Sequence, residues 1–423
     1  MPNVFNSRCL LPRRDFLRAA GAGALLAAAG PLDAAPLRTA SRAFLCEHGF
    51  WEYVTPCTGG FEAYDLDDYL VALDDMAQAG MNSLVIMVKW LTTGYRSKLP
   101  FLDQLPGNKV IASGNRLLRR VMVEAGKRRI KVWLGAVTNH YDADKFGSIP
   151  HSIVPKMGGC PFRVGQYDPD APHMVERGAA IFAEILDEFA KPDGFVLEME
   201  YVDKRAPHRL KPYNAWAQGN DRATCRDINS VAAMDWFDYQ TAAIIRATKA
   251  VEKVVRDKGF RGDLATINKV SDPIDRATKG QVVNLEMMRP DCPGWATINY
   301  TYDKGSPTGN YDAYMEAGVT YPKGLGLNVY YLPRGVMTWG QWTDRARLQR
   351  SWQQDIADVL KYQPQNLWWF GAGTKSGGHH TSLSLLKRMG YNDDVAARRD
   401  LLRIAAPLRA AVDRAPNLEK QRT

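Results

Sequence analysis

The chain has 423 residues, a formal net charge of +9 and 45% hydrophobic residues. This length exceeds an average domain but is natural for a βα barrel with long loops. Its Lys and Arg residues are scattered without a basic stripe or a nucleic-acid motif, so nucleic acid is not expected as a partner. No apolar run approaches the about 20 residues that a membrane-spanning helix needs, so no integral membrane segment is expected.

The N-terminus has the order of an export signal. Arg13 and Arg14 stand before an uncharged stretch of Ala, Gly and Leu from Ala19 to Gly30. This order resembles a twin-arginine signal peptide, and a chance arginine pair before an Ala-rich tail is the alternative. We expect residues 1–35 to be removed and residues 36–423 to form a single barrel domain that is periplasmic or secreted.

The cysteines indicate neither a disulfide framework nor a metal site. Cys9 would leave with the signal, so five of the six cysteines would remain, and an odd number excludes a complete intramolecular set. Cys46 and Cys57 are the closest pair, and their spacing does not decide whether they are linked. There is no C-x-x-C motif or His cluster at ligand spacing, so we expect no metal and no other cofactor.

Short apolar runs alternate with stretches of helical periodicity along the rest of the chain. The predicted strands are Ala43–Gly49, Ser83–Lys89, Lys131–Val137, Gly194–Glu200, Asp263–Asn268, Val282–Met287, Gly326–Tyr331 and Asn366–Phe370. The clearest predicted helices are Asp65–Ala79, Ser113–Arg128, Pro172–Phe189, Ala232–Lys258 and Thr343–Tyr362, with a further helix at Val395–Val412. Eight βα repeats predict the α/β class and a (β/α)8 TIM barrel. A doubly wound sheet is the alternative, but no G-x-G-x-x-G or P-loop follows the first strand.

In such a barrel the active site lies at the C-terminal ends of the strands. Carboxylates and aromatic rings gather at these ends, which is typical of a sugar-cleaving cleft because pyranose rings stack on aromatic faces. The predicted substrate-binding residues are Glu47, His48, Trp90, His140, Tyr201, Asp203, Asn268, Lys269, Arg289, Tyr330, Trp368 and Trp369.

The fourth strand carries two carboxylates. Side chains alternate along a strand, so Val196, Glu198 and Glu200 share one face, which should point into the lumen. Two like charges close together raise the pKa of one of them, which is how a carboxylic acid stays protonated to act as a general acid. The predicted catalytic residues are Glu200 as acid or acid/base, Glu286 on the sixth strand as nucleophile or base, and Glu198, which could exchange roles with either.

This strand resembles that of the chitinase-like glycoside hydrolases of family 18, which reads Asp-Gly-x-Asp-x-Asp-x-Glu and ends in the proton donor. Asp193–Gly194 matches the start and Glu200 the donor, while Glu198 stands where the family has the Asp that orients the substrate, and Val196 replaces the earlier Asp. Asp168–Pro169 also resembles the Asp-Pro entry of other glycosidase-like barrels. The resemblance implies membership of the wider group of barrel glycosidases.

The leading hypothesis is therefore an exported glycoside hydrolase with a carbohydrate substrate. A polysaccharide lyase is the second class, in which Tyr201, Tyr330 or His140 would take the proton and Lys89, Lys269 and Arg289 would bind a uronate. A non-catalytic sugar-binding barrel is the third. Each predicted Glu has a structural alternative as a member of an ion pair. The sugar, the linkage and the oligomeric state do not follow from the sequence.

Overall fold

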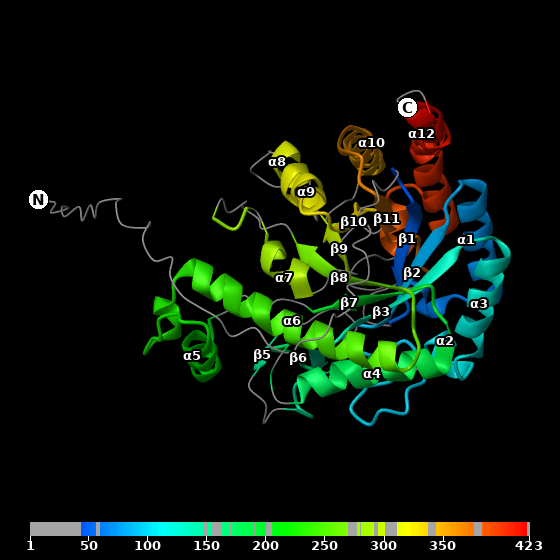
Figure 1. Cartoon of the computed structure of the whole chain (residues 1–423). Helices are drawn as coiled ribbons and strands as arrows, with labels where there is room; N and C mark the ends of the chain where they lie inside the picture. Colours follow the sequence, from blue (N-terminus) through cyan, green and yellow to red (C-terminus); the bar gives the residue numbers. More distant parts are fainter. Residues whose placement is uncertain are drawn as a thin grey trace, which may run out of the picture. The chain divides into compact units, whose positions relative to one another are not determined.

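Eight parallel strands close into a barrel in the order β1-β11-β10-β9-β8-β7-β3-β2 (Figure 1). The barrel strands are β1 (Glu47–Tyr53), β2 (Ser83–Lys89), β3 (Lys131–Val137), β7 (Gly194–Glu198), β8 (Asp263–Lys269), β9 (Trp295–Tyr300), β10 (Asn328–Leu332) and β11 (Asn366–Phe370). The prediction of a (β/α)8 TIM barrel is confirmed.

This computed structural model describes residues 44–55, 60–105, 107–146, 151–153, 162–169, 171, 173–189, 191–199, 205–269, 277–279, 281–291, 295–300, 311–336, 344–375 and 383–420. The predicted export signal lies outside these ranges. Residues 40–423 cluster into one unit.

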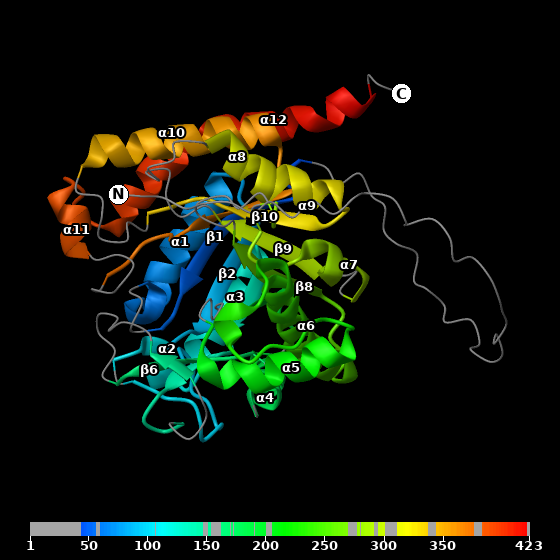
Figure 2. The ribbon, with the colours of Figure 1, turned by 90° about the vertical axis from the view of Figure 1, so that its left-hand side faces the viewer.

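Helices follow most of the barrel strands and surround the sheet (Figures 1 and 2). They are α1 (Leu66–Gln78), α2 (Lys109–Ala112), α3 (Arg116–Lys127), α4 (Met174–Phe189), α5 (Leu210–Gly219), α6 (Ala233–Asp257), α7 (Leu285–Asp291), α8 (Tyr311–Met315), α9 (Tyr321–Gly324), α10 (Arg345–Tyr362), α11 (Leu383–Arg388) and α12 (Asp394–Lys420). Single turns of other helix types are η1 (Phe61–Ala63), η2 (Pro207–Arg209), η3 (Ile228–Ser230) and η4 (Glu316–Thr320). Helix α1 begins where the sequence signals it, because Asp65 and Asp68 form a capping box. Helices α10 and α12 pack side by side (Figure 2).

A small antiparallel sheet follows β3 and was not predicted. It has the order β4-β6-β5, with β4 at His140–Asp142, β5 at His151–Ile153 and β6 at Val164–Tyr167. Asn139 fixes the start of this sheet, because its backbone oxygen accepts a hydrogen bond from Tyr167 N at 2.9 Å. The sheet therefore begins three residues after the last residue of β3, next to the mouth of the barrel.

The first strand lies later in the chain than predicted. The apolar residues before Glu47 favoured Ala43–Gly49, but Leu45 has a φ of +51°, which interrupts an extended strand. The strand instead runs from Glu47 to Tyr53, so the predicted end of the strand is its beginning.

The predicted sixth strand is wrong. Val282–Met287 leads into helix α7, because the Asn284 side chain accepts a hydrogen bond from Met287 N at 3.1 Å and so caps the helix. The sixth barrel strand is β9, which pairs with β8 and β10.

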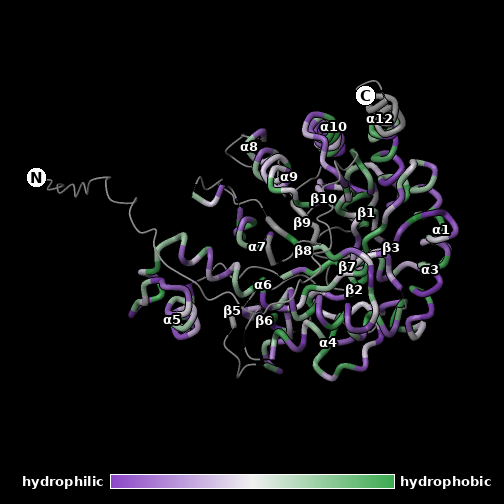
Figure 3. The backbone as a smooth tube through the Cα atoms, in the orientation of Figure 1, coloured by the Kyte–Doolittle hydropathy of each residue, from purple (hydrophilic) through white to green (hydrophobic). Residues whose placement is uncertain are grey.

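Two apolar cores lie on the two faces of the closed sheet. One face of each strand packs against the surrounding helices, whose surfaces mix hydrophilic and hydrophobic residues (Figure 3). The other face fills the lumen with a cluster of large side chains. The members of this lumen cluster are Trp51, Tyr53, Val85, Met87, Trp90, Leu91, Trp133, Val137, Val164, Val196, Ala265, Ile267, Tyr330, Leu332, Trp368 and Phe370. The lumen is therefore a packed core, so a catalytic site of the kind found in barrel enzymes must lie at its mouth.

Candidate functional site

Glu198 is the last residue of β7, the fourth strand of the barrel along the chain. Val196 belongs to the lumen cluster, whereas Phe195 and Leu197 pack on the helix side of the sheet. Because side chains alternate along a strand, Glu198 shares the lumen face with Val196. Glu198 is 3% exposed, and its backbone oxygen accepts a hydrogen bond from Thr138 N at 3.0 Å. A buried carboxyl group thus lies at the C-terminal end of the lumen.

Polar and basic groups from β2 and β4 lie at the same end of the barrel. Lys89 ends β2, is 1% exposed, and donates a hydrogen bond from Nζ to the backbone oxygen of His140. The same ammonium lies 4.3 Å from the centre of the Tyr141 ring. Asn139 donates from Nδ2 to the backbone oxygen of Tyr167 at 3.1 Å. These contacts hold β4 and β6 against the end of β2.

Aromatic rings cover the top of the lumen on the side of β1. The Trp90 ring lies 5.9 Å from the Tyr53 ring and 6.4 Å from the His140 ring. Tyr53 in turn meets Phe370 edge to face, with ring centres 5.9 Å apart. Of the predicted aromatic residues, Trp90 and His140 thus lie at the mouth with Glu198. Tyr53, Trp90 and His140 are themselves at most 3% exposed, so these rings pack against one another within the fold at this end of the barrel.

A buried ion pair stands beside this mouth. Asp168 follows β6, and its Oδ1 lies 2.9 Å from Arg209 Nε, while its Oδ2 lies 3.4 Å from His208 Nε2. Arg209 is 1% exposed, and its guanidinium lies 4.6 Å from the Trp236 ring and 5.5 Å from the Tyr239 ring. This pair ties the small sheet to the turn η2, which follows the segment after β7.

The floor of the lumen is also polar, and Glu47 belongs to it. Glu47 begins β1, and its Oε2 accepts hydrogen bonds from Ser83 Oγ at 3.0 Å and Trp133 Nε1 at 2.9 Å. Its Oε1 pairs with Lys131 Nζ at 2.8 Å, and Trp368 Nε1 donates to Ser83 Oγ at 3.0 Å. The expected place of Glu47 at the active-site end is wrong, because it lies at the amino end of the strands, where residues stabilise the barrel.

The predicted aromatic platforms of β10 and β11 are core residues. Tyr330 stacks on Trp368 with ring centres 4.1 Å apart, and Trp368 is also 5.0 Å from the Trp133 ring. Trp368 pairs in register with Gly49, near the amino end of β1, and both Tyr330 and Trp368 are at most 1% exposed. They pack low in the lumen, so their expected place in an open cleft is wrong.

His48 and Trp369 lie outside the lumen altogether. Trp369 packs on the helix side of the sheet, and its Nε1 donates to His48 Nε2 at 3.0 Å. Burial lowers the pKa of His48 to about 4. His48 was expected among the substrate-binding residues at the C-terminal end, and that placement is wrong because β1 begins four residues later than predicted. Trp369 was expected there too, but it alternates with Trp368 along β11 and therefore faces the helices.

Replacing Glu47 with Ala tests its structural role. The change leaves the Ser83, Trp133 and Lys131 donors without their acceptor, so we expect the free energy of unfolding to fall by about 2–4 kcal/mol. Urea denaturation measures this fall, and the exposed Asp67→Ala on α1 is the matched control, with a change within about 0.5 kcal/mol. A Glu47→Ala chain of unchanged stability would contradict the structural role.

Glu286 and Arg289 lie on helix α7 instead of on a barrel strand, and both are exposed. Glu286 Oε1 pairs with Lys279 Nζ at 2.6 Å and accepts a hydrogen bond from Tyr321 Oη at 2.9 Å. Hydrogen bonds from Lys279 and Tyr321 lower the pKa of Glu286, which favours the ionised form. The prediction that Glu286 ends a strand and faces Glu200 from the lumen wall is therefore wrong.

Glu200, Tyr201 and Asp203 lie outside the described residues. Asn268 and Lys269 end strand β8, and their side chains lie outside the description. The catalytic roles of Glu198 and Glu200 stay predictions.

β1 carries a buried carboxyl group, Glu52, that is not among the predicted site residues. Glu52 is fully buried, and its Oε2 accepts hydrogen bonds from Ala372 N at 2.7 Å and Gly373 N at 3.3 Å. Burial raises the pKa of Glu52 to about 8, and the nearby charge of Glu62 acts in the same direction. The partners come from beyond β11, some 320 residues away, so no local pattern could indicate them.

In the ranges that the structure describes, no group of three or more His, Cys, Asp or Glu side chains has the arrangement of a metal site. No helix within these ranges is long and apolar enough to cross a membrane.

Comparison with known proteins identifies the fold. No protein-family model matches the chain, and no curated protein is similar to it. The β-galactosidase from the psychrophilic Marinomonas ef1 has a TM-score of 0.57 at 13% identity, over 87% of this chain and 60% of that chain. The PgaB (BpsB) glycoside hydrolase domain from Bordetella bronchiseptica has a TM-score of 0.54 at 14% identity, over 84% and 98%. The catalytic domain of β-amylase from Paenibacillus polymyxa has a TM-score of 0.52 at 9% identity, over 82% and 98%. The chain spans three fifths of the β-galactosidase and nearly the whole of the other two, and it shares with all three the barrel fold of glycoside hydrolases.

Proposed function

We propose that the chain is an exported glycoside hydrolase that cleaves O-glycosidic bonds of an oligo- or polysaccharide by carboxylate acid/base catalysis. The observation that carries the proposal is the buried carboxyl of Glu198 at the C-terminal end of the lumen. Catalytic groups of barrel enzymes come from the carboxyl ends of the strands, and Lys89, Trp90 and His140 lie at the same end of the barrel as Glu198. The three similar structures are a β-galactosidase, the catalytic domain of a β-amylase and a glycoside hydrolase domain, which supports the same class of substrate.

The chemistry needs two acids with different protonation states. A protonated carboxyl donates its proton to the leaving glycosidic oxygen, and a second carboxylate attacks the anomeric carbon or activates a water. The proposal assigns the donor to Glu200, which follows Glu198 by two residues in the sequence. It assigns the second carboxylate to Glu198, because Glu286 is paired with Lys279 on the surface. The twin-arginine signal would deliver the folded enzyme to glycans outside the cytoplasm.

The test identifies the product and the donor together. The purified protein is incubated with neutral and uronate-containing polysaccharides, and we expect new reducing ends without an ultraviolet-absorbing unsaturated sugar. Glu200→Gln is expected to abolish hydrolysis while leaving sugar binding nearly intact, because the amide is far too weak an acid to protonate the leaving oxygen.

Three other results would contradict this function. An unsaturated uronate product would show a lyase, for which Lys89 and His140 at the mouth supply a cation and a base. Binding without any product would show a sugar-binding barrel. Wild-type turnover of Glu200→Gln on a substrate with a poor leaving group would remove Glu200 as the donor.

A further inference from the structure

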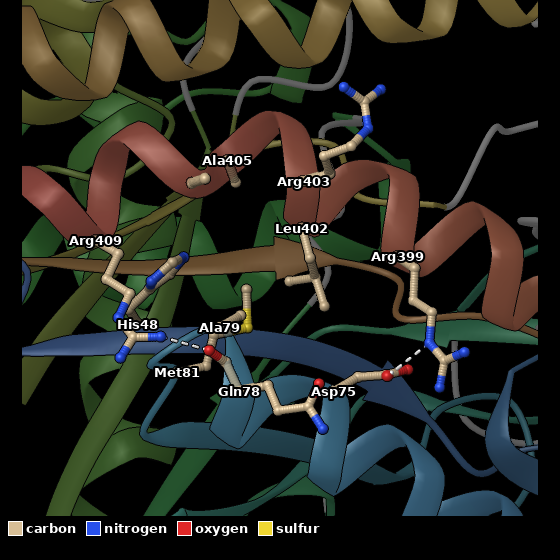
Figure 4. A pocket seen from close by; sticks show the side chains of 11 residues that line it. His48, Asp75, Gln78, Ala79, Met81, Arg399, Leu402, Arg403, Ala405 and Arg409 are labelled. Carbon is tan, nitrogen blue, oxygen red and sulfur yellow. Dashed lines mark hydrogen bonds and ion pairs between the residues drawn. The ribbon is translucent and has the colours of Figure 1, made fainter.

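A second concave site lies at the other end of the barrel, between α1, α12 and the start of β1 (Figure 4). His48 is the second residue of β1 and Met81 stands two residues before β2, so the groove lies at the amino ends of the strands. Its volume is about 310 Å³. Small side chains from the two helices, including Ala79 and Ala405, leave this space open. The groove is therefore separate from the mouth that holds Glu198.

A buried hydrogen-bond donor faces this groove. His48 lines the groove and is 6% exposed. Its Nε2 accepts a hydrogen bond from Trp369 Nε1, and burial lowers its pKa to about 4, so the neutral ring carries its proton on Nδ1. His48 and Arg409 both line the groove (Figure 4). The neutral ring of His48 adds no charge to it, so the charge of the groove is set by its arginines and carboxylates.

Three arginines of α12 line the groove in a row. Arg399, Arg403 and Arg409 span ten residues of the helix, which is about 15 Å along its axis. The side chains of Arg399 and Arg403 are 62% and 70% exposed. Arg409 donates a hydrogen bond to the backbone oxygen of Gln78 (Figure 4). Figure 4 shows the side chains of Arg399 and Arg409 directed from α12 towards α1, with the exposed Arg403 guanidinium on the other side of α12, so the three cations flank the groove.

The acids near the groove do not balance this charge. Asp75 is 5% exposed and is shared between Arg398, at 2.9 Å, and Arg399, at 2.8 Å. Asp400 is likewise shared between Arg345, at 3.2 Å, and Arg403, at 2.7 Å. Each carboxylate thus has two arginines, and Arg409 adds a further cation, so the groove keeps a net positive charge.

We propose that this groove is an accessory binding site for an acidic polysaccharide, whose carboxylates pair with Arg399, Arg403 and Arg409. A planar carboxylate matches the two parallel donors of a guanidinium. A row of this length fits an extended chain with repeated charges better than a single small anion. A flat lipid surface would not reach His48 at the base of the groove. The choice of a polysaccharide rests on the proposed function, and the carboxylate chemistry rests on the groove alone.

The test measures binding of a hexameric oligogalacturonate to the purified protein by calorimetry. Arg403→Gln/Arg409→Gln is expected to raise the dissociation constant at least tenfold. Ala406→Trp fills the groove without changing its charge, and the chain should fold because Ala406 is exposed. We expect this variant to raise the dissociation constant at least tenfold as well. The control Arg116→Gln/Arg120→Gln removes two exposed arginines from α3, and its dissociation constant should stay within about twofold. Binding should weaken with added salt.

Three other results would overturn the proposed binding site, and one further variant distinguishes binding at the groove from catalysis at the mouth. If the α3 control loses as much affinity for the oligogalacturonate as the groove variant, the attraction is non-specific and the proposal is overturned. Binding of duplex DNA or anionic vesicles at the groove that is tighter than binding of the oligogalacturonate would also overturn it. A neutral hexasaccharide that binds as tightly would overturn it too. Glu198→Gln should leave this dissociation constant unchanged, so a failure of the proposed hydrolysis and a failure of the groove are seen in different measurements.

Discussion

Replacing Glu198 with Gln is expected to lower the turnover of glycoside hydrolysis by roughly 10²–10⁴-fold, the usual size of a lost catalytic carboxyl. The amide keeps the shape of the side chain but neither attacks carbon nor takes a proton from water. Glu198 is 3% exposed at the end of β7, so the nearly isosteric change should leave the strand in place. Steady-state rates on an aryl glycoside or a polysaccharide, together with a melting curve, separate lost chemistry from lost folding.

Glu286→Gln is the matched control for this experiment. It makes the same chemical change, but Glu286 lies on α7 and pairs with Lys279 at 2.6 Å on the surface. Its turnover is expected to stay within about twofold of the wild type, because an exposed ion pair contributes little. Equal losses in the two variants, or full turnover of a folded Glu198→Gln chain, would remove Glu198 from the catalytic machinery.

The strands that sequence reasoning located best are those with continuous apolar runs. β2, β3 and β11 have the predicted bounds, because each is a short run of β-branched, aromatic or aliphatic residues buried on both faces. Helix α1 was equally clear, since Asp65 supplies a cap before a one-sided apolar pattern. Local pattern was therefore enough for the class of the fold.

Local pattern failed where a polar side chain finds its partners far away. Glu47 was expected near the carboxyl end of the first strand, yet it begins β1, and Trp133 and Ser83 satisfy its carboxylate at the floor of the lumen. Around Glu286, a short apolar run fits a strand and a helix equally well, and only the cap at Asn284 favours the helix. Both errors moved predicted site residues to the wrong end or the wrong face.

In the candidate site, too, some features follow from the local sequence pattern and others depend on contacts between distant segments. The alternation along β7 was enough to predict that Glu198 faces the lumen. The Asp168–Arg209 pair was not predictable, because it joins the end of β6 to a turn 41 residues later through a buried contact. Side chains that support a site from distant segments need the fold before they can be named.

Glu52 is expected to make the protein less stable as the pH rises. Its carboxyl lies at the carboxyl end of β1 and holds the backbone of Ala372 and Gly373 beyond β11, so it ties together two strands at the mouth of the barrel. Burial raises its pKa from 4.5 to about 8. Below about pH 4.5 the group is protonated in both the folded and the unfolded chain.

Above that pH the unfolded chain loses the proton while the folded chain keeps it, so unfolding releases a proton and the free energy of unfolding falls until about pH 8. The interval between the two pKa values corresponds to about 5 kcal/mol in total, and to about 2 kcal/mol between pH 6 and 8.

Urea denaturation of the wild type and Glu52→Gln at pH 6, 7, 8 and 9 measures this difference. The amide cannot ionise, so Glu52→Gln should lose most of the pH dependence. It should also be less stable than the wild type at pH 6, because the amide no longer accepts the hydrogen bond from Tyr53 N. Glu176→Gln, an exposed Glu on α4, should keep the wild-type slope. Parallel curves for the wild type and Glu52→Gln would mean that the folded protein already holds Glu52 ionised, and the two strands would then be tied by a buried charge.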